Sequence, residues 1–206
     1  FRERHESAAQ PILVNGVVGP LGDGYRVEAA YTAKEAEALH RPQIEALAGA
    51  GADMISALTM TYAEEAIGIA RAAAAVGLPH VLSFTVETDG KLPSGQGLHQ
   101  AFAEVEATTT GSALFYMINC AHPSHFTPCL VGPMRERIGG IRANASRLSH
   151  AELDAATELD DGNPAEFGAD YAALARLLPG LRLVGGCCGS DHRHVAAVCG
   201  HLHKTA

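Results

Sequence analysis

Six apolar segments of strand length alternate with segments of helical periodicity along this chain, and this alternation restricts the fold more than any other feature. Regular alternation of strand and helix is typical of βαβ units, which build a parallel sheet. The predicted strands are residues 12–18, 53–58, 80–86, 113–119, 138–143 and 181–184. The predicted helices are residues 32–48, 62–76, 98–111, 126–137, 164–177 and 191–203. The sequence therefore predicts an α/β fold.

The spacing of the predicted strands, roughly 25 to 40 residues, suits both a (β/α) barrel and a doubly wound open sheet. Six units are two fewer than a closed eight-stranded barrel needs. The chain also starts at Phe1, with residues that look like the end of a helix. We therefore expect about two N-terminal β/α units to lie outside this sequence. No change in composition marks a linker, so we expect residues 1–206 to form one domain.

Composition and charge restrict the partners. The 206 residues are 47% hydrophobic, which suffices for a buried core, and their net charge of −8 leaves no basic stripe for nucleic acid or an anionic membrane. Apolar stretches such as residues 67–76 are shorter than the roughly 20 residues that span a bilayer. We expect a soluble protein. Five cysteines, two of them adjacent, favour a reducing compartment, so the cytoplasm is the expected location.

The segment 184–190, Val-Gly-Gly-Cys-Cys-Gly-Ser, follows a predicted strand and opens a helix. Its cysteines, Cys187 and Cys188, therefore lie at the edge where parallel α/β folds build active sites. Cys120 follows the end of another predicted strand. Three thiolates would bind Zn²⁺ and leave one position open, which is typical of a catalytic zinc site. The alternatives are buried cysteines packed under a helix, or a vicinal redox dithiol. Cys129 and Cys199 fall within predicted helices and are interpreted as core residues.

The pairing of Asn119-Cys120 with Gly-Gly-Cys-Cys-Gly at 185–189 resembles the homocysteine S-methyltransferase family. The resemblance also includes segments 14–20, 39–44, 52–55, 83–85 and 141–145, and so covers essentially the whole chain. It implies a TIM-type (β/α)₈ barrel in which the three cysteines bind zinc. The chain departs from the family in two respects. The N-terminal glycine-rich strand and second unit are absent, and Leu58 stands where many members carry a glutamate that is concerned with the substrate amino group.

The resemblance further implies a zinc-dependent transfer of a methyl group from a sulfonium or quaternary ammonium donor to the thiol of homocysteine, giving methionine. Zinc removes the thiol proton, so no general acid or base is expected. The alternatives are the same chemistry on another thiol or selenol, and a truncated, non-catalytic barrel. The sequence specifies neither the donor nor the oligomeric state. Polar residues at strand ends that we expect to face the substrate are Asn15, Thr59, Ser83, Thr85 and Asn119.

Two further polar segments are interpreted as surface. His192 and His194 lie two residues apart in a predicted helix and point to opposite faces, which favours a solvated helix. Segments 149–154 and 158–161 are acidic, and solvated surface is the favoured interpretation. The alternative is that these acidic segments line the mouth of the barrel.

Overall fold

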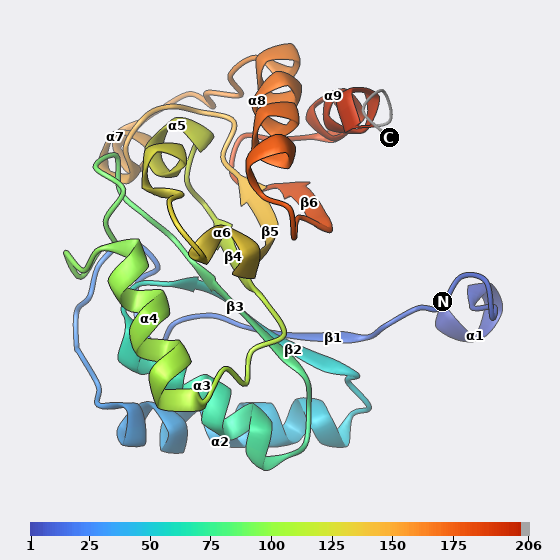
Figure 1. The fold of residues 1–206 in the computed structure, drawn as a ribbon, viewed down its shortest axis with the longest axis vertical. Helices are drawn as coiled ribbons and strands as arrows, with labels where there is room; N and C mark the ends of the chain where they lie inside the picture. Colours follow the sequence, from blue (N-terminus) through green and yellow to red (C-terminus); the bar gives the residue numbers. More distant parts are fainter. Residues whose placement is uncertain (203–206) are drawn as a thin grey trace.

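A six-stranded parallel sheet forms the centre of the computed structural model, which describes residues 1–202. The strands are β1 (Asn15–Val18), β2 (Met54–Met60), β3 (His80–Phe84), β4 (Tyr116–Asn119), β5 (Ile138–Ala143) and β6 (Leu183–Gly186). They lie side by side in chain order, and each neighbouring pair is parallel. Within the described residues β1 and β6 are the two edges, so the sheet is open and curls without closing (Figure 1). The α/β class is confirmed, whereas a closed barrel is not what these residues form.

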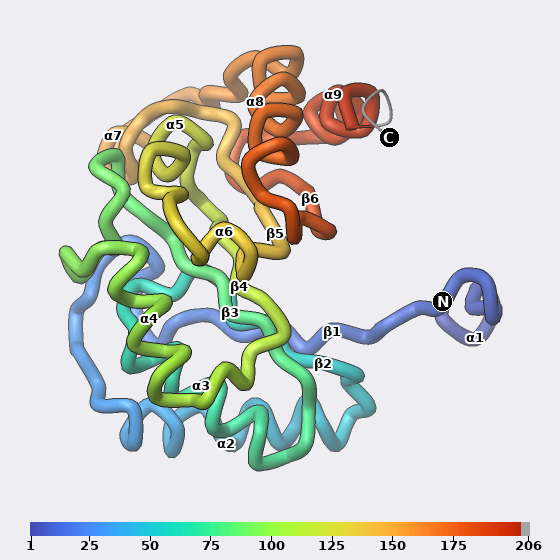
Figure 2. The backbone as a smooth tube through the Cα atoms, viewed as in Figure 1, coloured from blue at the N-terminus to red at the C-terminus, as the bar shows by residue number. Residues whose placement is uncertain are grey.

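Apart from α1, the longer helices pack along the outside of the sheet (Figure 1). The helices are α1 (Arg2–His5), α2 (Ala33–Gly49), α3 (Ala63–Ala75), α4 (Leu98–Thr109), α5 (Pro123–Phe126), the 3₁₀ turn η1 (Thr127–Cys129), α6 (Met134–Arg137), α7 (His150–Ala155), α8 (Pro164–Leu177) and α9 (His192–Leu202). The backbone path in Figure 2 places α1 on an extended arm away from the sheet. Among residues 1–202, no helix is long and apolar enough to cross a bilayer.

The start of α2 follows directly from its sequence. The Thr32 hydroxyl accepts from the backbone amide of Glu35, while the Glu35 carboxylate accepts from the backbone amide of Thr32. This capping box satisfies amides that the first helical turn would otherwise leave unpaired. Gly68 then allows α3 to approach α2 closely, because a Cβ there would lie 2.6 Å from the Cβ of Ala36.

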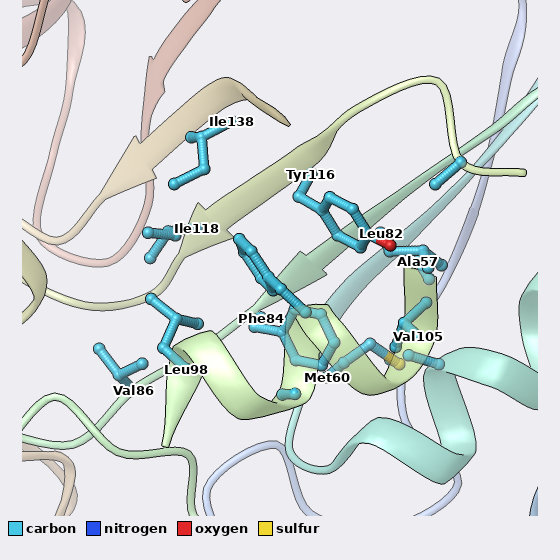
Figure 3. Packing of buried hydrophobic residues seen from close by; sticks show 14 of the residues in the cluster. Ala57, Met60, Leu82, Phe84, Val86, Leu98, Val105, Tyr116, Ile118 and Ile138 are labelled. Atoms are coloured by element: carbon cyan, nitrogen blue, oxygen red, sulfur yellow. The ribbon is translucent and has the colours of Figure 1, made fainter. Parts of the chain in front are cut away.

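The hydrophobic core lies between the sheet and its outer helices. Every residue of β3 is buried, as expected for an interior parallel strand covered on both faces. Figure 3 shows Phe84 and Tyr116, from β3 and β4, packed near Leu98 and Val105 of α4. Phe102 of α4 stacks on Tyr116 with ring centroids 4.5 Å apart. The apolar positions of strands and helices thus meet in one cluster, which fixes the strand ends that carry the site.

The predicted strands and five of the six predicted helices are confirmed, with bounds that differ by at most three residues. The last residue of the sixth predicted helix, His203, lies outside the described residues. The prediction of one helix over residues 126–137 is wrong. Pro128 and Pro133 cannot donate the backbone hydrogen bonds of a continuous helix, and Gly132 adopts a left-handed φ of 64°. The segment forms short turns instead, so Cys129 lies in η1 rather than inside a helix.

Candidate metal centre

Three cysteine side chains meet at the carboxyl edge of the sheet. Cys120 directly follows β4, and Cys187 and Cys188 directly follow β6. Their sulfur atoms all lie within 4.8 Å of one another. β5 lies between β4 and β6 in the sheet. The thiols still meet, because the carboxyl ends of parallel strands lie at the same edge of the sheet. The structure therefore brings together the three cysteines that the sequence analysis identified.

Cys120 has a strained backbone that hydrogen bonds hold in place. Its φ is +53°, in the left-handed region that residues with a side chain rarely adopt. Its carbonyl accepts from His150 Nε2 at 2.6 Å and from the Thr85 hydroxyl at 3.2 Å. Its amide donates to the carbonyl of Arg142 at 3.1 Å. Strain fixed in this way is characteristic of functional positions.

The turn that carries Cys187 and Cys188 is tied to the end of β5. The amide of Cys187 donates to the carbonyl of Ala143 at 2.8 Å, and the amide of Cys188 donates to Asn144 Oδ1 at 3.2 Å. The Ser190 hydroxyl donates back to the Cys187 carbonyl at 2.7 Å. Hydrogen bonds to neighbouring segments therefore fix the backbones of both cysteines.

Glycine is required at two positions of this turn. A Cβ on Gly186 would lie 1.9 Å from Ser190 Oγ. Gly189 has a φ of +76°, and a Cβ there would lie 2.6 Å from the carbonyl oxygen of Asp160. These close approaches explain why adjacent cysteines occur within a glycine-rich segment.

Tyr171 of α8 locks β6 to β5 just before the cysteines. Its ring is fully buried, and its hydroxyl donates to the carbonyl of Gly185 at 2.5 Å. The same hydroxyl accepts from the amide of Ala143 at 3.0 Å. A helix side chain thus sets the position of the strand end from which Cys187 and Cys188 follow.

Asn119 organises the polar groups beside Cys120. Its side-chain oxygen accepts from the Thr59 amide at 2.9 Å and from the Ser83 hydroxyl at 2.5 Å. Its side-chain nitrogen donates to the Thr59 hydroxyl at 2.7 Å. That hydroxyl lies 3.9 Å from the sulfur of Cys120. Thr59, Ser83 and Asn119 therefore form one cluster that reaches the cysteines.

Comparison with known proteins identifies the family. A sequence model of the family described as Homocysteine S-methyltransferase matches residues 1–202. The chain belongs to the homocysteine S-methyltransferase family.

This family member is similar in sequence and in fold to known homocysteine methyltransferases. It is 28% identical over 197 residues to the homocysteine S-methyltransferase of Escherichia coli (strain K12), covering 92% of this chain and 63% of that protein. The metallated form of the homocysteine methyltransferase MmuM from Escherichia coli matches with a TM-score of 0.68 at 25% identity, over 94% of this chain and 62% of that one. Its apo form matches with a TM-score of 0.66 at 25% identity, over 94% of this chain and 64% of that one. The chain thus spans less than two thirds of the length of these relatives.

The adjacent cysteines of this homocysteine S-methyltransferase family member have pKa values shifted in opposite directions. The pKa of Cys188 is lowered because its thiolate accepts hydrogen bonds from Cys120 and Cys187. The pKa of Cys187 is raised because it hydrogen-bonds to the same two neighbours and is partly buried. In the metal-free cluster the neighbouring thiols therefore oppose complete ionisation. Three thiolates at this distance repel one another, so a bound cation is what makes the fully deprotonated state accessible.

Two side chains that the sequence analysis did not identify touch the cysteines of this family member. The Tyr25 hydroxyl, from the loop between β1 and α2, contacts the sulfur of Cys188 at 3.8 Å. The Tyr25 ring packs on the imidazole of His150 with centroids 4.0 Å apart. Segment 149–154 is mostly exposed or half-buried, as predicted for solvated surface, but His150 within it is buried and bonds to Cys120. The only sequence signal for Tyr25 is its place in a βα loop.

A cavity of about 260 Å³ opens beside Cys188. The Tyr25 ring, apolar side chains and carboxylates line it, and none of the lysines or arginines among residues 1–202 does. Among the lining residues are Leu153, Asp154, Glu158 and Leu159. The acidic segments therefore border the site, as the alternative interpretation stated.

Three other residues lie where the sequence analysis did not expect them. Asn15 begins β1 and pairs with Met54, the first residue of β2, so it lies at the amino edge of the sheet, opposite the cysteines. His194 is fully buried rather than solvated, and its Nε2 donates to the carbonyl of Asp161 at 2.8 Å. Cys199 is exposed on α9 rather than in the core. The structure brings none of these three to the cysteine site.

Proposed function

We propose that this chain binds Zn²⁺ through Cys120, Cys187 and Cys188 and takes part in methyl transfer to the thiol of homocysteine, giving methionine. The observation that carries the proposal is the approach of three sulfur atoms to within 4.8 Å at the ends of two parallel strands. Membership of the homocysteine S-methyltransferase family supports homocysteine as the acceptor. A related methyltransferase described in a metallated form supports a metal.

The residues present fit zinc by the chemistry of their donor atoms. Thiolates are soft ligands, which favour Zn²⁺ over hard cations such as Mg²⁺ or Ca²⁺. Three protein ligands are the usual number in catalytic zinc sites, where a further position remains for water or substrate. When bound, zinc would stabilise the acceptor sulfur as a thiolate at neutral pH.

The residues around Cys120 would bind and orient the acceptor. Thr59 is half-buried, and its hydroxyl lies close to the Cys120 sulfur, so it is available to a bound thiol compound. Asn119 and Ser83 are buried and fix Thr59 through hydrogen bonds, so they would act by supporting that residue. Thr85 is fully buried on the Cys120 carbonyl and would act by supporting that residue.

The cavity beside Cys188 would receive the methyl donor. Its carboxylates, Asp154 and Glu158, and the Tyr25 ring favour a positive charge, which suits a sulfonium or quaternary ammonium group. In the transfer, the acceptor thiolate forms a bond to the methyl carbon while the bond from that carbon to the donor sulfur or nitrogen breaks. The electron pair of the broken bond stays with the donor, which loses its positive charge, and no proton moves.

We also propose that the six described β/α units belong to a (β/α)₈ barrel of the TIM type. The fold shared with MmuM supports this, since this chain covers 62% of that structure. Three free thiols in one site favour a reducing compartment such as the cytoplasm.

Metal content tests the site first. We expect about one Zn²⁺ per reduced chain, lost in Cys120→Ala and in Cys187→Ala and kept in the matched control Cys199→Ala. Absence of zinc from the parent under reducing, metal-replete conditions would contradict the metal centre.

Methyl transfer to homocysteine is then measured with S-methylmethionine and with betaine as donors. Methionine formed only by zinc-loaded chains with intact cysteines is the expected result. Zinc binding without any transfer would favour a non-catalytic barrel.

A further inference from the structure

We infer that His150 and Tyr25 are positioning residues of the three-cysteine site. His150 positions Cys120, Tyr25 positions Cys188, and the contact between their rings joins these two halves of the site. The inference concerns the same site as the proposed function, but it does not require the methyl transfer to be correct. It rests on contacts that link segments from four different parts of the chain: the loop after β1, the end of β4, the start of α7 and the end of β6.

His150 holds the Cys120 half. Its Nε2 donates to the Cys120 carbonyl at 2.6 Å, and its Nδ1 lies 2.9 Å from the Glu87 carboxylate. The imidazole is therefore fixed at both nitrogens, and it is buried. Because Cys120 has a left-handed backbone, loss of this hydrogen bond would let the residue relax toward a more populated conformation. Thr85 alone, at 3.2 Å, would then hold the carbonyl.

Tyr25 holds the Cys188 half and reaches it from a fixed loop. The amide of Leu21 donates to the carboxylate of Glu65 at 2.7 Å, and the amide of Tyr31 donates to the Tyr62 hydroxyl at 3.2 Å. Glu65 is itself buried in α3. The loop is thus anchored on both sides of Tyr25, so the hydroxyl that contacts Cys188 is held in place before any ligand binds.

The contact between the two rings connects the two halves. The Tyr25 ring lies against the His150 imidazole with centroids 4.0 Å apart and planes tilted by 32°. Removing the Tyr25 ring would expose His150 and loosen its bond to Cys120, whereas removing only the Tyr25 hydroxyl would leave the ring contact intact. Tyr25→Phe is therefore expected to affect Cys188 alone, and Tyr25→Ala is expected to affect Cys120 as well.

Alkylation of the reduced, metal-free chain by iodoacetamide, followed by mass spectrometry of each cysteine, tests this arrangement. In His150→Leu we expect the alkylation rate of Cys120 to rise about fivefold or more. The loss of one hydrogen bond makes local opening around Cys120 more favourable by about that factor. His150→Gln keeps a donor toward the carbonyl and should restore a rate near that of the parent. Tyr25→Phe should change the rate of Cys188 alone, and Tyr25→Ala should change the rates of both Cys120 and Cys188.

Exposed Cys199 on α9 is the internal control for these rates. Unchanged rates at Cys120 in His150→Leu would overturn the inference. So would an equal rise at Cys199, because His150 would then support the fold as a whole. Failure of His150→Gln to restore the rate would also overturn it.

Binding of Co²⁺, followed by thiolate-to-metal charge-transfer absorption, adds a spectroscopic readout. We expect His150→Leu and Tyr25→Ala each to weaken Co²⁺ binding. The double variant should bind Co²⁺ about as tightly as the weaker-binding single variant, because the two residues act as one unit. Fully additive losses would overturn the pairing. A parent chain that binds no Co²⁺ would instead contradict the metal centre of the proposed function, and the alkylation rates would still decide the positioning roles.

Discussion

The side-chain oxygen of Asn119, at the end of β4, accepts from the backbone amide of Thr59 in β2, 2.9 Å away and on the far side of β3. Thr59 has a φ of +62°, so this bond fixes a left-handed residue. Ser83 of β3 donates to the same oxygen from the strand in between. One buried amide therefore connects three strand ends beside Cys120.

Replacing Asn119 should destabilise the chain because Asn119 is buried and is the acceptor for two other groups. Asn119→Ala leaves the Thr59 amide and the Ser83 hydroxyl without their acceptor, and we expect the free energy of unfolding to fall by about 2–3 kcal/mol. Urea denaturation measures the change. Gln96→Ala removes a hydrogen bond to Glu104 at the surface and should stay within about 0.5 kcal/mol of the parent. Equal losses in the two variants would contradict the central role of Asn119.

Tyr171 and Tyr116 allow the same change to be compared at two buried sites. Tyr171→Phe removes the hydroxyl that joins Gly185 to Ala143, and we expect a loss of about 1–3 kcal/mol. Among the described residues, the Tyr116 hydroxyl is buried without a hydrogen-bond partner, so Tyr116→Phe should be neutral or stabilising. Thermal unfolding of both variants measures the difference. A larger loss for Tyr116→Phe would show that the lock between β5 and β6 is misassigned.

Two glycines near the C-terminal end should respond to alanine in opposite directions. Gly189→Ala places a Cβ 2.6 Å from the Asp160 carbonyl at a φ of +76°, and we expect a loss of about 2 kcal/mol or more, together with loss of metal binding. Gly200, within α9, has open space around its Cβ position, so Gly200→Ala should stabilise the chain by up to about 1 kcal/mol. Denaturation midpoints and metal content distinguish the two. Tolerance of alanine at position 189 would mean that the cysteine turn is not tightly fixed.

His80 should make stability depend on pH in the mildly acidic range. Burial lowers the pKa of His80 below its usual value, so the unfolded chain binds a proton that the folded chain disfavours. The free energy of unfolding should therefore decrease as the pH falls below about 6.5 and stay level with respect to this group above it. In His80→Gln the decrease should be shallower, as followed by denaturation between pH 7 and pH 5 (roughly the window around that pKa). The exposed His99→Gln is the matched control and should keep the slope of the parent.

Local patterns in the sequence determined the secondary structure and the identity of the clustered cysteines. Hydrophobic periodicity depends on neighbours a few residues apart, which explains why it predicted the strands and most helices. Where local signals were misjudged, as with Pro128 and Pro133 in the helix expected over residues 126–137, the structure differs. The glycines around Cys187 and Cys188 indicated a turn that could present both sulfurs, and the approach of Cys120 followed from the shared edge of parallel strands.

Tertiary structure alone decided which distant side chains complete the site. Contacts of Tyr25 with Cys188 and of His150 with Cys120 join residues 163 and 30 positions apart, and they depend on strand order and loop path rather than on spacing along the chain. The direction of β1 placed Asn15 at the far edge of the sheet, although its residue type suits a binding site. The sequence thus determined the elements and the metal-ligand candidates, because these depend on short-range chemistry. The packing of the sheet decided the surroundings of the thiols, because those depend on long-range contacts.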